Sequence, residues 1–284
     1  PFVLVYETVE DDDDDDYNPP HRPSNPDKDD DEDDEPEDLN TEDHVAYIIG
    51  YTDGTVRPQG NIARSEVATI FFRLLTDEAR ETYWSQYSPY SDVKADAWYN
   101  NAISTLTNMG ILDGYLDGTF RPTAPITRSE FTKIAVSFFD YADEHFVYDG
   151  RFSDVEGNEW YVNFLAAAIE YGLIEGMPDG TFHPLDNITR AEACTIVNRT
   201  LGRAPHEDHL LPWREMITWP DNSNTDAWYY AAMQEATNSH DYAWTVEDRE
   251  DVEEWTEKLE ERDWAALERT WSDAHDAPGG EVMD

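Results

Sequence analysis

The chain has 284 residues, of which 39% are hydrophobic, enough for a core within one or two domains. Its 64 acidic and 19 basic residues give a formal net charge of −45, which excludes nucleic acid and anionic lipid as electrostatically favoured partners. The single cysteine, Cys194, excludes an intramolecular disulfide and a cysteine-based metal site. It lies in an apolar stretch, which predicts a buried and unreactive thiol. No run is long and apolar enough to span a bilayer, so we expect no membrane insertion.

The N-terminal region divides into two parts by composition. Residues 1–9 include the apolar run Phe2–Tyr6, which is typical of a strand at the end of a preceding domain. Residues 10–43 are acidic and contain several prolines, which predicts a disordered linker. Low-affinity calcium binding by these carboxylates is the alternative interpretation. Because the chain starts at Pro1, we expect it to be a piece of a longer protein.

One phrase occurs three times, roughly 60 residues apart. It reads GYTDGTVRP at 50–58, GYLDGTFRP at 114–122 and GMPDGTFHP at 176–184. Such a period predicts one structural unit used three times. Three similar surfaces favour a multivalent binding device over a single catalytic pocket.

Each phrase predicts a tight turn followed by a helix. The Asp-Gly pair supplies positive φ at little steric cost, and the proline ends the extended arm. Thr127 and Glu130 then have the spacing of a capping box, as do Thr189 and Glu192. In the first copy Ala63 replaces the capping threonine, so this helix start should be the least secure, by about 0.5–2 kcal/mol.

A second half-repeat has an aspartate in its first three residues and ends in Trp-Tyr, at residues 91–99, 153–161 and 219–229. An apolar helical pattern follows each copy. The chain begins with the turn half and ends with this other half, so we infer that residues 219–242 replace the opening half missing before Gly50. Degeneration of both ends is the competing interpretation. We expect the tryptophans to be mainly core residues, with the adjacent tyrosine hydroxyls reaching a groove.

Residues 243–284 predict an acidic helix and tail. Six apolar residues recur at roughly helical spacing, and Glu254 with Lys258 forms an i,i+4 pair. The stripe is typical of a packing face and consists of Val252, Trp255, Leu259, Trp264, Leu267 and Trp271.

An arginine occupies the first position of each motif helix: Arg64, Arg128 and Arg190. A cation is unfavourable at this end of the helix dipole. One explanation is an anionic ligand bound by the exposed N–H groups and the guanidinium fork. The other is a salt bridge to one of the abundant carboxylates, and the sequence does not decide between the two.

The combined pattern resembles the S-layer homology (SLH) domain. It comprises Ser-Asp-Val, Trp-Tyr, the Gly-Tyr-x-Asp-Gly-Thr-Phe-Arg-Pro turn and Ile-Thr-Arg-x-Glu, and it covers residues 44–242 with its best copy at 91–139. The resemblance implies a mainly α fold, in which three helical repeats form a pseudo-three-fold assembly around a central three-helix bundle. The repeats would span residues 44–90, 91–152 and 153–218, closed by the half-repeat at 219–242, within a monomer.

The same resemblance implies a function without catalysis or cofactor. It implies non-covalent anchoring of a bacterial surface protein to the cell wall or S-layer, by binding a secondary cell-wall polysaccharide, often pyruvylated, in grooves between repeats. The ligand-binding residues that it suggests are Arg64, Glu66, Arg128, Glu130, Arg190 and Glu192. We add Trp98, Tyr115, Arg121 and Trp160 as further candidates for glycan contact.

Departures from the pattern make the three grooves unequal. Ala63 breaks the first motif, while Met177 and His183 alter the third turn. We therefore expect the groove around Arg128 to be the most competent. The competing functions are an enzyme, a calcium-binding module built on the Asp-Gly turns, and a protein-interaction scaffold. No catalytic triad or metal-ligand spacing is visible, and the scattered His44, His183 and His206 have no evident role.

Overall fold

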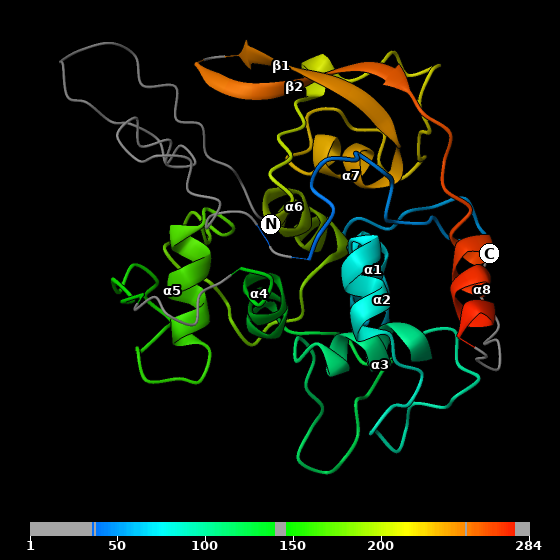
Figure 1. Cartoon of the computed structure of the whole chain (residues 1–284). Helices are drawn as coiled ribbons and strands as arrows, with labels where there is room; N and C mark the ends of the chain where they lie inside the picture. Colours follow the sequence, from blue (N-terminus) through cyan, green and yellow to red (C-terminus); the bar gives the residue numbers. More distant parts are fainter. Residues whose placement is uncertain (1–35, 37, 140–145, 248, 276–284) are drawn as a thin grey trace, which may run out of the picture.

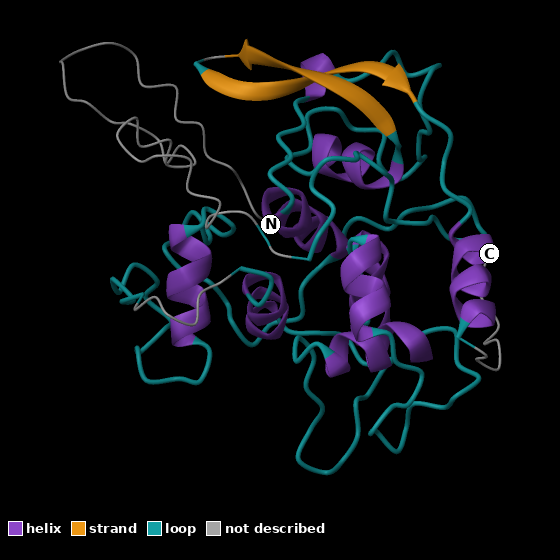
Figure 2. Cartoon of the chain, viewed as in Figure 1, coloured by secondary structure: helices purple, strands orange, loops and turns teal. Residues whose placement is uncertain are grey.

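The computed structural model describes residues 36, 38–139, 146–247 and 249–275. Within them the fold is mainly α, as predicted, with short helices, long connecting loops and one two-stranded sheet (Figures 1 and 2). In chain order the elements are α1 Arg64–Leu74, α2 Asp77–Tyr83, α3 Asn100–Asn108, α4 Arg128–Val136, α5 Val162–Glu170, α6 Arg190–Thr200, η2 Glu207–His209, α7 Tyr230–Thr237, β1 His240–Glu247, β2 Glu250–Lys258 and α8 Trp264–Ala274.

The expected strand at Phe2–Tyr6 and most of the expected linker lie outside the described residues. The linker boundary at residue 43 is wrong, because the chain joins the fold before that point. Leu39 is buried in the core and forms an isolated bridge with Leu75. The backbone N–H of Asn40 also donates to the carbonyl of Leu74.

Each repeated phrase forms the turn that its glycine predicts. Gly54, Gly118 and Gly180 have φ of 77–79°. The residue just before the proline of each phrase also lies in the left-handed region, although it is not glycine. Its φ is 52° at Arg57, 60° at Arg121 and 55° at His183. This conformation is disfavoured for such side chains, so a local interaction must hold it.

An aspartate from the other half-repeat holds that conformation. Asp92 accepts hydrogen bonds from the N–H groups of Phe120 and Arg121 at 2.7 and 2.8 Å. Asp154 does the same for Phe182 and His183 at 2.8 and 2.7 Å. One carboxylate therefore fixes two consecutive backbone groups of the turn in each of these two units.

The first turn obtains its aspartate from the C-terminal half-repeat. Asp221 accepts from the N–H groups of Val56 and Arg57 at 3.0 and 2.7 Å. The packing is also equivalent: a Cβ added at Gly50 would lie 2.1 Å from the Trp219 ring, as one at Gly114 would lie 2.2 Å from Tyr90. The segment 219–237 thus takes, for the turn at 50–58, the place that the preceding half-repeat takes in the other two units.

The three motif helices meet at their N-terminal ends in a closed ring. The N–H of Ile62 donates to the carbonyl of Ile188, that of Ile188 to Ile126, and that of Ile126 to Ile62, at 3.0–3.3 Å. Each motif helix also packs on the helix that belongs to the next unit, pairing α1 with α3, α4 with α5, and α6 with α7. These contacts describe a cyclic arrangement, whereas the central three-helix bundle stays a prediction.

The capping boxes at α4 and α6 are confirmed. Thr127 accepts from the N–H of Glu130 while Glu130 accepts from the N–H of Thr127, and Thr189 and Glu192 repeat the pair. At α1 the reciprocal bond is missing because alanine has no side-chain acceptor. The bond from the N–H of Ala63 to Glu66 remains, at 2.8 Å.

The predicted C-terminal helix is wrong for the first part of its stripe. The strands β1 and β2 pair in antiparallel fashion, with an irregularity between Asp241 and Tyr242, and lie over α7 in Figure 1. β-Branched residues such as Thr245, Val246 and Val252 favour strands. Lys258 pairs with Glu261 and not with Glu254. A helix does follow, as α8, whose Glu268 bonds Arg73 of α1 at 2.9 Å.

Cys194 is 1% exposed, as predicted, and burial raises the pKa of its thiol to about 12, so it stays protonated at neutral pH. None of the helices described is both long and apolar enough to cross a membrane.

We expect Asp221→Ala to destabilise the fold by about 1–3 kcal/mol, because two backbone N–H groups lose a charged acceptor. Urea unfolding followed by tryptophan fluorescence measures this change. Asp226→Ala, an exposed aspartate of the same segment, is the matched control and should change stability by less than about 0.5 kcal/mol. Equal effects of the two variants would contradict the role assigned to Asp221.

We expect Ala63→Thr to stabilise the fold by about 0.5–2 kcal/mol, because it supplies the missing half of a capping box. The backbone at Ala63 (φ −83°, ψ 154°) already matches that at Thr127 (φ −80°, ψ 160°), so the hydroxyl has the required position. The urea midpoint should rise at unchanged slope. Ala63→Val, which matches threonine in shape without its hydroxyl, should bring no gain.

Candidate functional site

The three N1 arginines link each repeat unit to the next. The Nε of Arg64 donates to the carbonyl of Phe120 at 2.8 Å, that of Arg128 to Phe182 at 2.6 Å, and that of Arg190 to Val56 at 2.9 Å. Each acceptor belongs to the repeated turn of the neighbouring unit. The guanidinium therefore holds a turn that lies across a unit boundary and not its own helix end.

The same arginines form ion pairs with the glutamates of the neighbouring motif helices. The distances are 3.2 Å for Arg64–Glu130, 3.1 Å for Arg128–Glu192 and 2.9 Å for Arg190–Glu66. The three arginines are 6%, 2% and 3% exposed. The hypothesis that they face open clefts is therefore wrong for this structure, and the salt-bridge explanation of their position holds. Burial lowers the pKa of Arg128 to about 10, so it remains charged at neutral pH.

Each glutamate of a pair accepts hydrogen bonds from several groups. Oε2 of Glu130 caps its own helix, while Oε1 accepts from Arg64 and from the hydroxyl of Tyr115, the latter at 3.0 Å. Glu66 makes the corresponding bonds to Arg190 and Tyr51. The third turn has Met177 in place of the tyrosine, and the side chain of Glu192 is only 8% exposed, against 22% for Glu130.

A stack of cations and aromatic rings leads from the buried arginines to the surface at two boundaries. The guanidinium carbons of Arg64 and Arg121 lie 4.9 and 3.9 Å from the centre of the Tyr115 ring. Tyr51 has the same relation to Arg190 and Arg57, at 5.0 and 3.8 Å. The side chain of Arg121 is 50% exposed, so it is a cation that a dissolved anion can reach.

The exposed arginines are held by weak interactions. Arg121 pairs with Asp117 at 3.0 Å, and both side chains are about half exposed. Exposed pairs of this kind contribute only about 0–1 kcal/mol. An incoming carboxylate can therefore compete with Asp117 at little cost.

Trp98 and Trp160 do not join the arginine stacks. Trp160 is 56% exposed, so the expectation that the repeat tryptophans are mainly core residues is wrong there. Trp98 is half-buried beside a hollow of about 20 Å³, which Trp84 of the connecting loop also lines. The adjacent tyrosine, Tyr161, is 4% exposed and contributes to the core instead.

The aspartates of the turns are already used within the turns. Asp53 and Asp117 accept from the N–H and hydroxyl of Thr55 and Thr119, and bond the arginine four residues on. These hydrogen bonds, those of the threonine hydroxyls first, lower the pKa of both carboxyls to about 2. The geometry does not favour the calcium-binding alternative, because the ligand oxygens are occupied.

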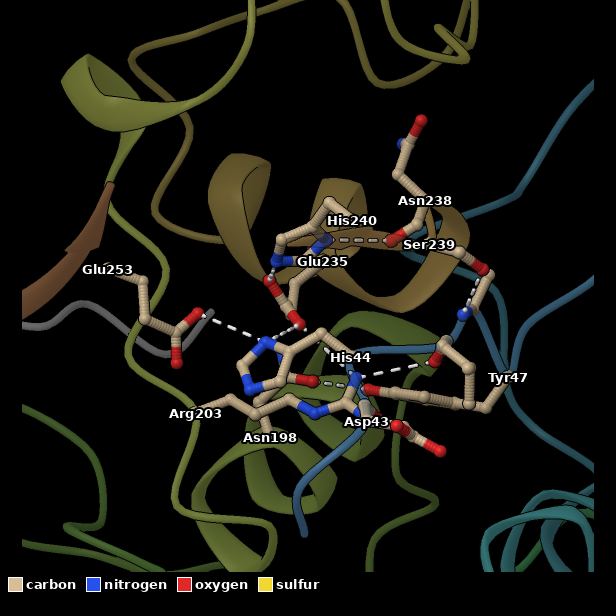
Figure 3. A network of polar contacts seen from close by, with 12 residues as sticks. Asp43, His44, Tyr47, Asn198, Arg203, Glu235, Asn238, Ser239, His240 and Glu253 are labelled. Atoms are coloured by element: carbon tan, nitrogen blue, oxygen red, sulfur yellow. Dashed lines mark hydrogen bonds and ion pairs between the residues drawn. The ribbon is translucent and has the colours of Figure 1, made fainter. Parts of the chain in front are cut away.

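The structure gathers four residues that sequence analysis did not connect: His44, Glu235, His240 and Glu253 (Figure 3). All four are buried. No short motif predicts them, because they come from three distant parts of the chain and the spacing of Glu235 and His240 matches no ligand pattern. His44 had been left without a role. The segment after Met233 is rich in polar and acidic residues throughout, so Glu235 and Glu253 do not stand out in it.

Comparison with protein families identifies part of the repeat region. Residues 89–132 and 151–194 match the model described as the S-layer homology domain. These two segments are S-layer homology repeats. Each contains an aspartate half, a turn and the start of a motif helix, which are the parts that Asp92 and Asp154 join. The third unit, assembled from the two ends of the region, has no separate match, and its assignment rests on its geometry.

Several curated proteins are similar to this chain over part of its length. A cellulosome-anchoring protein of Acetivibrio thermocellus is 31% identical over 212 residues, covering 73% of this chain and 45% of the relative. Cell surface glycoprotein 1 of the same organism is 39% identical over 57% of this chain and 7% of its own length. An amylopullulanase of Thermoanaerobacterium thermosulfurigenes is 35% identical over 55% of this chain and 8% of its own length. The chain thus spans less than half the length of these relatives.

We expect Arg128→Met to lower the free energy of unfolding by about 3–5 kcal/mol, because it leaves the carboxylate of Glu192 buried without its cation. Arg121→Met, which breaks an exposed ion pair, is the control and should cost less than about 1 kcal/mol. Urea unfolding of both variants measures the difference. If Arg128→Met were as mild as its control, the ion pair would not be a structural link.

Proposed function

We propose that this chain anchors a bacterial surface protein non-covalently to the cell envelope by binding a secondary cell-wall polysaccharide at the boundaries between repeat units. The observation that carries the proposal is the match of two segments to the S-layer homology domain. One of the relatives has the printed name cellulosome-anchoring protein. The chain therefore acts at the cell surface, as part of the cell wall or S-layer.

The ligand is an acidic glycan, and a pyruvylated one fits the surface cations. The protein carries a formal charge of −45, which repels an anionic polymer at long range. Binding must then depend on local cations. Arg57 and Arg121 meet this need, since each is half exposed and stacked on a tyrosine at a unit boundary. A pyruvyl carboxylate can accept from such a guanidinium in place of the turn aspartate.

The buried arginines support this site without touching the glycan. Arg64 and Arg190 lie beneath Tyr115 and Tyr51 and bond the glutamates that hold the tyrosine hydroxyls. This assigns ligand contact to Arg57, Tyr51, Arg121 and Tyr115, and positioning to the six residues of the arginine–glutamate pairs. The proposal therefore moves the most competent groove from Arg128, which is 2% exposed, to the boundary with Arg121.

We propose no catalytic role for this chain. Its matched relatives include an amylopullulanase, of which the matching region covers 8%, so that protein's length lies mostly outside the shared segment. A larger protein containing this chain would carry its own activity elsewhere, while this segment retains it at the wall.

We expect Arg57→Gln/Arg121→Gln to bind purified wall polysaccharide about tenfold less tightly than the parent chain, because each site loses one charge-assisted hydrogen bond. Co-sedimentation with native and depyruvylated wall glycan measures the retention. Arg151→Gln is the matched control, since Arg151 forms a similarly exposed pair with Asp149 and belongs to neither tyrosine stack.

Retention by the parent chain should fall on depyruvylated glycan, and retention by the control should equal that of the parent. Unchanged retention by the double variant, with an unchanged melting temperature, would contradict the assignment of these two arginines. Binding to envelope protein that wall glycan does not compete for would instead favour the interaction-scaffold alternative.

A further inference from the structure

Four potential metal ligands converge beneath the hairpin. His44 lies ahead of the first turn, Glu235 on α7, His240 at the start of β1 and Glu253 within β2 (Figure 3). Their side chains are 0–2% exposed. One ligand atom from each lies within 4.8 Å of the others. Burying two carboxylates and two imidazoles together is costly unless something compensates their polarity.

The atoms that face the centre of this group lack hydrogen-bond partners within the described residues: His44 Nδ1, Glu235 Oε2, His240 Nε2 and Glu253 Oε2. Neighbouring atoms are close enough, at 3.2 Å from His44 Nδ1 to Glu235, 3.4 Å to Glu253, and 3.3 Å from His240 Nε2 to Glu235. Their alignment does not suit hydrogen bonds. Four buried polar atoms without hydrogen-bond partners in one cluster are unusual in a folded protein.

Other contacts orient these atoms inward. Nδ1 of His240 lies 2.9 Å from the carbonyl of Asn238, and as a donor there it leaves Nε2 with its lone pair facing the group. Oε1 of Glu253 accepts from the N–H of Ala204 at 2.8 Å, and Oε1 of Glu235 bonds Arg203 at 3.2 Å. The His240 ring stacks on Trp255 at 3.8 Å, and that of His44 on Tyr242 at 3.9 Å.

We propose that His44, Glu235, His240 and Glu253 form a structural binding site for a divalent transition metal ion, with Zn²⁺ the best fit. Two imidazoles and two carboxylates are a ligand set that Zn²⁺ accepts in tetrahedral sites. Imidazole ligands disfavour Ca²⁺ and Mg²⁺, which prefer oxygen. In a tetrahedral site with bonds of about 2.0–2.1 Å, ligand atoms lie about 3.3 Å apart. The distances of 3.4 Å from His44 Nδ1 to Glu253 Oε2 and 3.3 Å from His240 Nε2 to Glu235 Oε2 match this spacing. The group as a whole spreads to 4.8 Å, so the ligands would have to move closer together around the ion.

The charge of the surroundings suits a divalent cation. Glu235 and Glu253 supply two negative charges, and Arg203 supplies one positive charge from the side of Glu235. A neighbouring cavity of about 230 Å³ is lined by His44 and His240 together with Tyr242, so two of the four ligands border open space. The competing arrangement is metal-free, with a proton on Glu253, since burial and the charge of Glu235 raise the pKa of that carboxyl to about 8.

The ion would join three parts of the chain: the segment that enters the first unit, the helix of the closing half-repeat, and the C-terminal hairpin. The site lies away from the arginine stacks, so it does not depend on the proposed glycan binding. The bound ion would cross-link the hairpin to the ring of repeats.

The test uses the full chain freed of metal with a chelator and dialysed against Zn²⁺. We expect one Zn²⁺ per chain by elemental analysis, and a melting temperature about 5–10 °C higher at saturating Zn²⁺ than in chelator, with no rise in Mg²⁺. Replacing Zn²⁺ by Co²⁺ should give the visible absorption of a four-coordinate ion, which a structural role without metal cannot produce.

Variants assign the ligands. Glu253→Gln keeps the acceptor for Ala204 but removes the anionic ligand. We expect Glu253→Gln and His240→Gln, each as a single variant, to weaken Zn²⁺ binding at least tenfold. His209→Gln is the matched control, since His209 pairs with Glu247 of the same hairpin outside the site, and it should bind one equivalent as the parent does.

Three results would each overturn the proposal. The first is a Zn²⁺ content well below one per chain, with no rise in melting temperature. The second is unchanged Zn²⁺ affinity in Glu253→Gln. The third is a Glu253→Gln variant as stable as the Zn²⁺-treated parent, which would identify the metal-free, protonated network.

Discussion

The fold depends on three ion pairs, in each of which a buried arginine of one repeat unit meets a glutamate of the next. A single guanidinium meets a neighbouring carboxylate and a neighbouring turn carbonyl, while that carboxylate caps its own helix. Helix starts, turns and unit boundaries are therefore set by the same few atoms. The arginine occupies the unfavourable end of each helix dipole because its bonding partners belong to the adjacent unit.

The cyclic contacts are alike in backbone but unequal at the surface. Two boundaries present a tyrosine stacked with an exposed arginine, whereas the third has Met177 and His183. His183 lies 3.5 Å from Asp186, and its imidazole takes the place of the guanidinium in the other two turns. The units thus share one architecture, while the chemistry offered to a ligand differs among their boundaries.

Local features could be predicted from sequence because their causes are local. The Asp-Gly turns and the boxes at Thr127 and Thr189 need only neighbouring residues. The hairpin could not be predicted from sequence, because Val252 and Trp255 fit a helical spacing as well as a strand. Pairing with residues 240–247 makes this segment a strand. The arginines were ambiguous because burial depends on the neighbouring unit. Glu235 and Glu253 looked like two acidic residues among 64, and only the folded chain places them beside His44 and His240.

The bond from Asp221 to Val56 spans 165 residues and has a consequence for the order of assembly. Two units hold their aspartate and turn within one continuous stretch, so each can fold as soon as that stretch has left the ribosome. The unit that contains the turn at 50–58 cannot be completed until residues 219–237 have been synthesised. At about 5–20 residues per second, the delay is about 10–30 s. During that interval the apolar edges of the open ring are exposed, and chaperone binding or premature association with another nascent chain is most probable then.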